Sequence, residues 1–129
     1  MAVTTPRPDT QAFQEAMTLP FPDVVKRLQA LLDERVIAFI GGVHDNRRVR
    51  EWASGLRHPR PGVEERLRVT LQVGTAIAGA SDGRVAQAWL LGLNPELDDR
   101  QPAQVLRDED LARNGRDVVA AARIFVTGG

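Results

Sequence analysis

The sequence contains no cysteine, which excludes disulfide bonds, thiolate metal sites and a cysteine nucleophile. Its only histidines are His44 and His58, too few for a histidine-rich metal site. No apolar run approaches the roughly 20 residues that a membrane-spanning helix needs. The first residues also lack the basic start and apolar core of a signal peptide. We therefore expect a cytoplasmic chain that crosses no membrane and holds no metal.

Motifs for catalysis are missing as well. The sequence has no G-x-G-x-x-G or Walker-type loop, and no serine or threonine with a histidine in a supporting position. Asp98 and Asp99 form a carboxylate pair, but a solvated loop does not raise a carboxylate pKa for acid catalysis. We predict that the protein is not an enzyme, has no catalytic residues and needs no cofactor.

Lysine is also scarce, since Lys26 is the only one, and the basic charge comes from arginine. The 17 basic and 17 acidic residues cancel, but they are unevenly spread. Residues 35–60 carry six arginines against two carboxylates, a net charge of +4. Residues 95–117 carry seven carboxylates against four arginines, a net charge of −3. This asymmetry indicates partners of different chemistry for the two regions; the alternative is a preference for arginine on a solvated surface.

Apolar spacing predicts an all-α protein. Over residues 21–61 an amphipathic helix from Pro22 precedes a short apolar helix, Val36–Ile40, which ends at Gly41 and Gly42. Asp45 is a suitable N-cap for a helix over residues 46–54, with Gly55 after its end. Val49 and Trp52 face inward by their spacing. This order of helix, glycine turn and helix resembles a helix-turn-helix of the Xre type.

In a helix-turn-helix the second helix lies in the major groove of DNA, with its N-terminal residues on base edges. The resemblance therefore places Asn46, Arg47 and Arg50 on bases, because asparagine pairs with adenine and arginine with guanine. Arg48, Arg57 and Arg60 are the predicted phosphate contacts. The alternative is a solvated arginine face on an ordinary bundle helix.

The longest predicted helix covers residues 62–80 and carries two apolar stripes. Such a helix is buried on two sides, so it either bridges two lobes or packs against a second copy of the chain. We predict a homodimer on this basis. Residues 1–20 contain Pro6, Pro8 and Pro20 and are predicted to be a flexible arm.

Residues 86–106, AQAWLLGLNPELDDRQPAQVL, contain a tryptophan helix, an Asn94-Pro95 turn and a helix that begins at Pro102. Leu93 and Leu97 are expected to fix the connector to the core. The pattern resembles the C-terminal domain of the Xre/MbcA/ParS antitoxin family, whose members are usually encoded beside a RES-domain toxin that degrades NAD. The sequence departs from the family at Asp98 and Asp99, where small residues such as glycine are common.

The resemblance implies an antitoxin that neutralises a RES-type toxin and represses its own operon by binding operator DNA. Its helix-turn-helix lobe is residues 21–61, and its toxin-binding helical domain is residues 62–129. In the family the end of the antitoxin chain obstructs the active-site cleft of the toxin, and the matching residues here are Ile124, Phe125 and Val126. The acidic residues Asp108, Glu109 and Asp110 suit the arginine-lined rim of such a cleft.

Two alternatives stay open from the sequence. A stand-alone Xre-like transcriptional regulator would need no toxin partner. Phe125 can also be read as a core residue that closes the domain, on the same side of the last helix as Val118, Val119 and Ala122. Asn114-Gly115 is expected to interrupt that helix.

Overall fold

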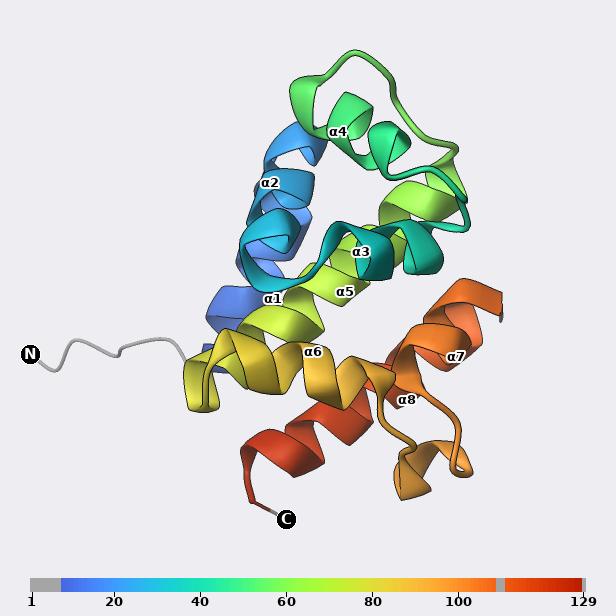
Figure 1. Cartoon of the computed structure of the whole chain (residues 1–129). Helices are drawn as coiled ribbons and strands as arrows, with labels where there is room; N and C mark the ends of the chain where they lie inside the picture. Colours follow the sequence, from blue (N-terminus) through green and yellow to red (C-terminus); the bar gives the residue numbers. More distant parts are fainter. Residues whose placement is uncertain (1–7, 109–110, 129) are drawn as a thin grey trace, which may run out of the picture.

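The computed structural model describes residues 8–108 and 111–128. Over these residues the chain is helical and has no β-strand, which confirms the all-α prediction (Figure 1). The elements are α1 (Pro8–Thr18), α2 (Phe21–Leu31), α3 (Glu34–Gly41), α4 (Asn46–Ser54), α5 (Pro61–Ala80), α6 (Gly83–Leu91), the 3-10 helix η1 (Pro95–Leu97), α7 (Pro102–Asp108) and α8 (Leu111–Val126). No described helix combines the length and the apolar character that crossing a bilayer requires.

Helix α5 runs through the middle of the molecule, and α1, α2, α3, α6, α7 and α8 all pack against it (Figure 1). Its buried residues include Leu67, Leu71, Val73 and Ile77, so the predicted two-sided burial is confirmed. The neighbours that cover α5 belong to the same chain, however. The argument that α5 needs a second copy to cover it is therefore wrong. Buried side chains from Ala16 to Ala122 form one cluster, so residues 21–61 and 62–129 share a core.

The segment Pro8–Thr18 forms helix α1, within the residues 1–20 that were predicted to be a flexible arm. Helix α1 packs on α5 and buries Ala12 and Ala16. The Arg68 guanidinium of α5 donates hydrogen bonds to the carbonyl oxygens of Ala16 and Leu19, at 2.8 Å each. The last carbonyls of a helix have no partner within it, and Arg68 supplies the donors that hold this end of α1.

Glycines and a capping aspartate set the ends of α3 and α4, as the sequence predicts. Gly42 ends α3 in the left-handed conformation, with a φ of 75°. The Asp45 side chain accepts a hydrogen bond from the Arg47 amide at 2.8 Å and caps α4. Gly55 ends α4 with a φ of 80°. Trp52 is buried as predicted, and a Cβ atom on Gly41 would lie 3.0 Å from its ring, so a side chain there would force the ring to shift by a few tenths of an ångström.

Residues 94–100 form a closed turn around η1. The Asn94 side chain accepts from the Glu96 amide at 2.9 Å, and the Asn94 amide donates to the Arg100 carbonyl at 3.2 Å. Leu97 points inward and is 2% exposed, as predicted, but Leu93 is 73% exposed, so its predicted core contact is wrong. Leu93 precedes Asn94, whose hydrogen bonds close the turn. Those hydrogen bonds do not orient the Leu93 side chain toward the core.

Two adjacent residues of this turn adopt the left-handed conformation, Asp98 with a φ of 58° and Asp99 with a φ of 61°. Glycine adopts this conformation without strain, and aspartate is among the few other residues that tolerate it. The turn therefore needs positive φ angles at two positions, and both are aspartates.

Helix α8 is continuous through Asn114 and Gly115, so the predicted interruption is wrong. One glycine inside a helix costs about 1 kcal/mol relative to alanine, and burial of Val118, Ala121 and Ala122 outweighs that cost. Phe125 continues the buried stripe by spacing but lies in the last turn, where it is 41% exposed. It does not close the core.

Candidate functional site

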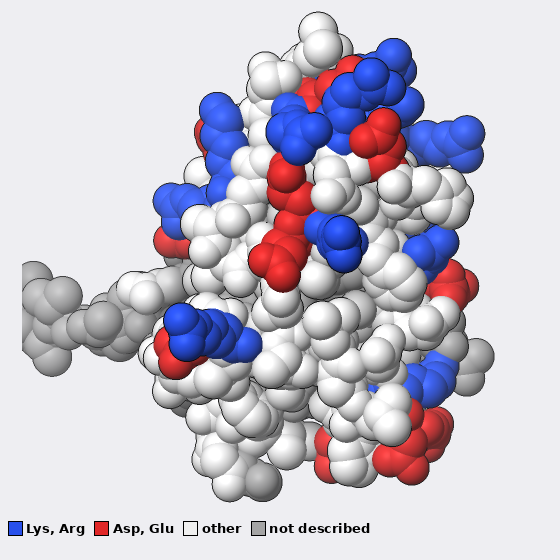
Figure 2. Space-filling view, in the orientation of Figure 1, with Lys and Arg blue, Asp and Glu red and all other residues white. Residues whose placement is uncertain are grey.

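Helix α4 lies at one end of the molecule and packs on α2 and α3 through Val49, Trp52 and Ala53 (Figure 1). Its opposite face is exposed, and arginine side chains gather there (Figure 2). We name this region the arginine end and define it by Arg35, Arg47, Arg48, Arg50, Arg57 and Arg60, all of which are exposed. Arg47, a predicted base contact, has a side chain that is 74% exposed. The five arginines predicted to bind DNA therefore share one end of the molecule.

Carboxylates lie between these arginines. The ion pairs are Arg47 with Asp45 at 3.6 Å, Arg48 with Glu51 at 3.4 Å, Arg57 with Glu51 at 3.2 Å and Arg50 with Glu34 at 3.1 Å. With Glu34 counted, the end carries six arginines against three carboxylates, a net charge of +3. Exposed ion pairs are worth at most about 1 kcal/mol, so a phosphate can replace a carboxylate at small cost.

The loop after α4 is fixed by a cluster around Glu64. The Glu64 carboxylate is 2.8 Å from His58 Nε2 and accepts a hydrogen bond from Arg68 Nε at 3.0 Å. Burial acts to raise the pKa of Glu64, but the hydrogen bonds and charges of Arg68 and His58 outweigh it and lower that pKa. The His58 ring also meets Phe21 edge-on at 5.3 Å. The loop that carries Arg57 and Arg60 is thus attached to α5 and α2.

Asn46 is the first residue of α4. It is half-buried and lines a pocket of about 560 Å³ at the start of α4, together with Arg35, His44 and Arg107. No sequence pattern pointed to Arg107, which belongs to α7 and reaches α3 only through the fold. Asn46 lies four positions before Arg50, so the two residues share one face of α4.

Apolar side chains are exposed at two places in the C-terminal half. Ile124 and Phe125 in the last turn of α8 are 39% and 41% exposed, whereas Val126 is half-buried and packs against the core. Leu91 and Leu93, at the end of α6, are exposed as well. The face over α6 and α8 is largely uncharged, in contrast to the arginine end (Figure 2). These surfaces suit a protein partner rather than a nucleic acid.

Of the predicted acidic contacts, Asp108 is exposed, accepts a hydrogen bond from Gln104 and lies 3.4 Å from Arg107 Nε. Glu109 and Asp110 lie outside the described residues. One of the three predicted acidic contacts is therefore placed, and part of its charge faces Arg107.

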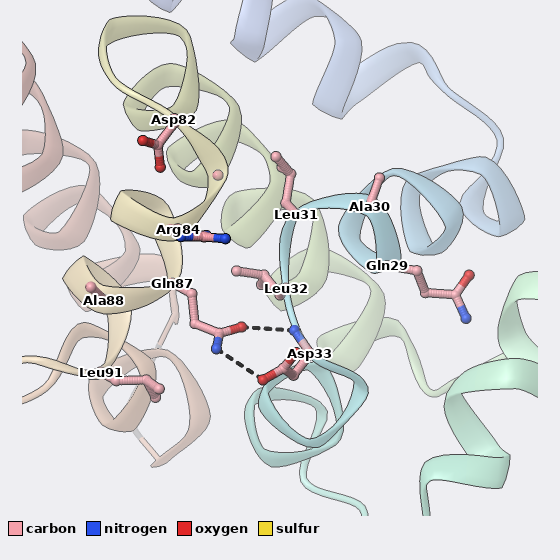
Figure 3. Close-up of a pocket in the computed structure, with 11 residues that line it drawn as sticks. Gln29, Ala30, Leu31, Leu32, Asp33, Asp82, Arg84, Gln87, Ala88 and Leu91 are labelled. Carbon is pink, nitrogen blue, oxygen red and sulfur yellow. Dashed lines mark hydrogen bonds between the residues drawn. The ribbon is translucent and has the colours of Figure 1, made fainter.

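A separate pocket of about 770 Å³ lies between the α2–α3 junction and α6 (Figure 3). Gln87 crosses it: its Oε1 accepts from the Asp33 amide at 2.7 Å, and its Nε2 donates to Asp33 Oδ2 at 3.0 Å (Figure 3). Asp82 caps α6 by accepting from the Val85 amide at 3.1 Å. The carboxylates of Asp33 and Asp82 each accept a hydrogen bond near the start of a helix. Among the described residues, no cluster of three or more acidic or histidine side chains could hold a metal ion.

The amide pair between Gln87 and Asp33 joins α6 to the start of α3. Replacing Gln87 with alanine is expected to lower the free energy of unfolding by about 1–2 kcal/mol, because two hydrogen bonds are lost. Chemical denaturation with circular dichroism measures this value. Gln11→Ala, on the exposed side of α1, is the matched control and is expected to change stability by less than about 0.5 kcal/mol. Equal effects of the two variants would contradict a bracing role for Gln87.

Comparison with models of known protein families, with curated proteins and with solved structures finds no match to this chain.

Proposed function

We propose that the chain is the antitoxin of a type II toxin–antitoxin pair, which binds and neutralises a RES-type toxin and represses its own operon by binding DNA. The observation that carries the proposal is the separation of two surfaces: an arginine end around α4, and exposed apolar side chains on α6 and α8. A polyanion and an apolar protein pocket are the partners that such surfaces fit.

The toxin-binding part rests on the last turn of α8. When a partner buries apolar side chains that are partly exposed at a helix end, the complex is stabilised by roughly 25 cal/mol per Å² of apolar surface removed from water. Ile124 and Phe125 meet this condition, and the family resemblance assigns the same segment to the toxin cleft. Val126 supports the turn from inside, and Asp108 offers a carboxylate to a basic rim.

The DNA-binding part rests on Arg47 and Arg50, which are exposed and one helical turn apart on α4. Arg48, Arg57 and Arg60 lie around them as phosphate contacts. A stand-alone regulator uses the same arginine end, so that end favours both candidates equally. A stand-alone regulator has no use for the exposed apolar residues of α8. These residues therefore favour the antitoxin.

Identification of the partner tests the toxin-binding part directly. The tagged chain is expressed together with the reading frame beside its gene, and the protein that co-purifies is identified by mass spectrometry. A stable complex with a RES-domain protein supports the proposal. Recovery of the chain alone favours the stand-alone regulator.

Dimerisation remains part of the proposal, with a different surface from the one first predicted. A groove of about 430 Å³ lies between α1, α5 and α8, and its apolar lining includes Phe13, Met17 and Val119. Phe13 and Met17 are about half exposed. Glu65 and Arg116 also line the groove, so a two-fold arrangement can set each charge against its opposite on the other copy.

Replacing Phe13 and Met17 together with glutamate is expected to convert a dimer into a monomer, because four carboxylates would enter an apolar interface. Light scattering at micromolar concentration measures the mass, with twice the chain mass expected for the unmodified protein. Leu56→Glu, at the arginine end, exchanges an exposed apolar residue of similar size and is expected to leave the dimer intact. A monomeric unmodified protein, or a dimer that survives the double substitution, would rule out this interface.

A further inference from the structure

The pocket at the start of α4 brings together polar groups from three segments of the chain. Arg35 comes from α3, His44 from the connector before α4, and Arg107 from α7. Within the described part of the chain, the side chains of Arg35, His44 and Asn46 have no hydrogen-bond or ion-pair partner. A pocket lined by unpaired donors is suited to a ligand that accepts several hydrogen bonds.

Arg107 is held in position before any ligand arrives. Its guanidinium lies over the Phe39 ring, 4.6 Å from the centroid, and its Nε is 3.4 Å from Asp108. The side chain is 29% exposed, so the group is partly fixed yet accessible to solvent. A pre-organised guanidinium loses little freedom when it binds an anion, and its planar fork matches phosphate oxygens.

Asp45 is the one carboxylate among the residues that line this pocket. Its Oδ1 accepts from the Arg47 amide at 2.8 Å, and its Oδ2 lies 3.6 Å from the Arg47 guanidinium. Its charge is therefore countered from the α4 side. With these ion pairs counted, Arg35, Arg47 and Arg107 stand against Asp45 and Asp108, and the excess of one positive charge favours an anion.

We propose that Arg35, His44 and Arg107 bind a backbone phosphate of the same DNA that α4 contacts. The inference rests on the proposed DNA binding and extends it, because it gives a residue of the C-terminal half a part in DNA recognition. The pocket is continuous with the arginine end, since Arg35 belongs to both. A duplex that lies on α4 presents phosphates on either side of the groove, and the pocket adjoins the first residue of that helix.

Duplex DNA from the region upstream of the gene, titrated by fluorescence anisotropy at several salt concentrations, tests the inference. Arg35→Gln and Arg107→Gln are each expected to weaken binding roughly tenfold, since a charge-assisted contact is lost. The loss should be equal on unrelated duplexes, and the slope of log affinity against log salt should fall by about one. Arg107→Lys keeps the charge and should retain the slope.

Arg84→Gln is the matched control. It removes one exposed arginine from α6, away from the pocket, and should change neither affinity nor slope. Because Arg107 also packs on Phe39, a loss of stability in its variants is checked by melting temperature. Arg35→Gln breaks no described contact and carries the test without that complication.

The outcomes separate the two proposals. If Arg47 and Arg50 variants lose binding while Arg35→Gln and Arg107→Gln bind like the unmodified protein, the pocket is not a phosphate site and DNA binding stands. If the unmodified protein binds no duplex, both the proposed DNA binding by α4 and the proposed phosphate site fail. Inorganic phosphate alone, followed by NMR, identifies the source: shifts at His44 and Asn46 without duplex binding would assign the pocket to a small anion and overturn the DNA assignment.

Discussion

Replacing Ile124 and Phe125 together with glutamate is expected to abolish the proposed protection of cells that express a RES-type toxin, while the chain stays folded. Both side chains are about 40% exposed in the last turn of α8, so they contribute little to the core. Two carboxylates in an apolar partner pocket should weaken the complex on the order of a thousandfold or more. Growth of cells that carry both proteins measures protection, and the melting temperature of the purified chain reports the fold.

Point substitutions are a sharper test than removal of residues 123–129. Val126 packs against the core, so truncation would remove a structural contact together with the exposed residues. Ala120→Glu, on an exposed part of the same helix, is the matched control and should retain full protection. Full protection by a stably folded Ile124→Glu/Phe125→Glu variant would eliminate the tail as the inhibitory element.

Loss of Arg47 and Arg50 is expected to have the second largest effect, on binding to the cognate operator. Each arginine that reads a guanine contributes about 1–3 kcal/mol, so the double alanine variant should lose about 2–6 kcal/mol at that site. Binding to unrelated DNA should change much less than this. Gel shifts with cognate and unrelated duplexes measure the difference.

Two further variants define what that result means. Arg48→Ala removes a predicted phosphate contact, so it should weaken binding to all duplexes alike and lower the salt slope by about one. Arg27→Ala removes an exposed arginine of α2 that pairs with Glu15, outside the arginine end, and should have little effect. Equal operator binding by the unmodified protein and the Arg47/Arg50 variant would refute base recognition by α4.

The helix boundaries were accessible from the sequence because short-range chemistry determines them. Gly42 and Gly55 adopt left-handed conformations that end α3 and α4. Asp45 caps α4 through a bond two residues away, and Pro102 begins α7 with the φ angle already fixed. Each signal acts within one helical turn, so it can be read without knowing what the helix packs against.

The errors share a different cause, which is contact over long range. Helix α1 is held by Arg68, some fifty positions away, and nothing within residues 1–20 announces that donor. The two-sided burial of α5 was identified correctly but attributed to a second copy, because the sequence does not say that α1 and α8 reach it. In the candidate site, Glu34 and Arg107 were missed for the same reason: they reach α4 and its connector only through folding.

The proposed function centres on inhibition of a RES-domain toxin, and NAD consumption by such a toxin measures that inhibition most directly. A RES-domain protein that co-purifies with the chain is incubated with NAD while the purified chain is added in increasing amounts. The proposal predicts that NAD consumption falls to zero once the chain saturates the toxin, and that the Ile124→Glu/Phe125→Glu variant leaves consumption unchanged. Undiminished NAD consumption in the presence of excess folded chain would contradict it.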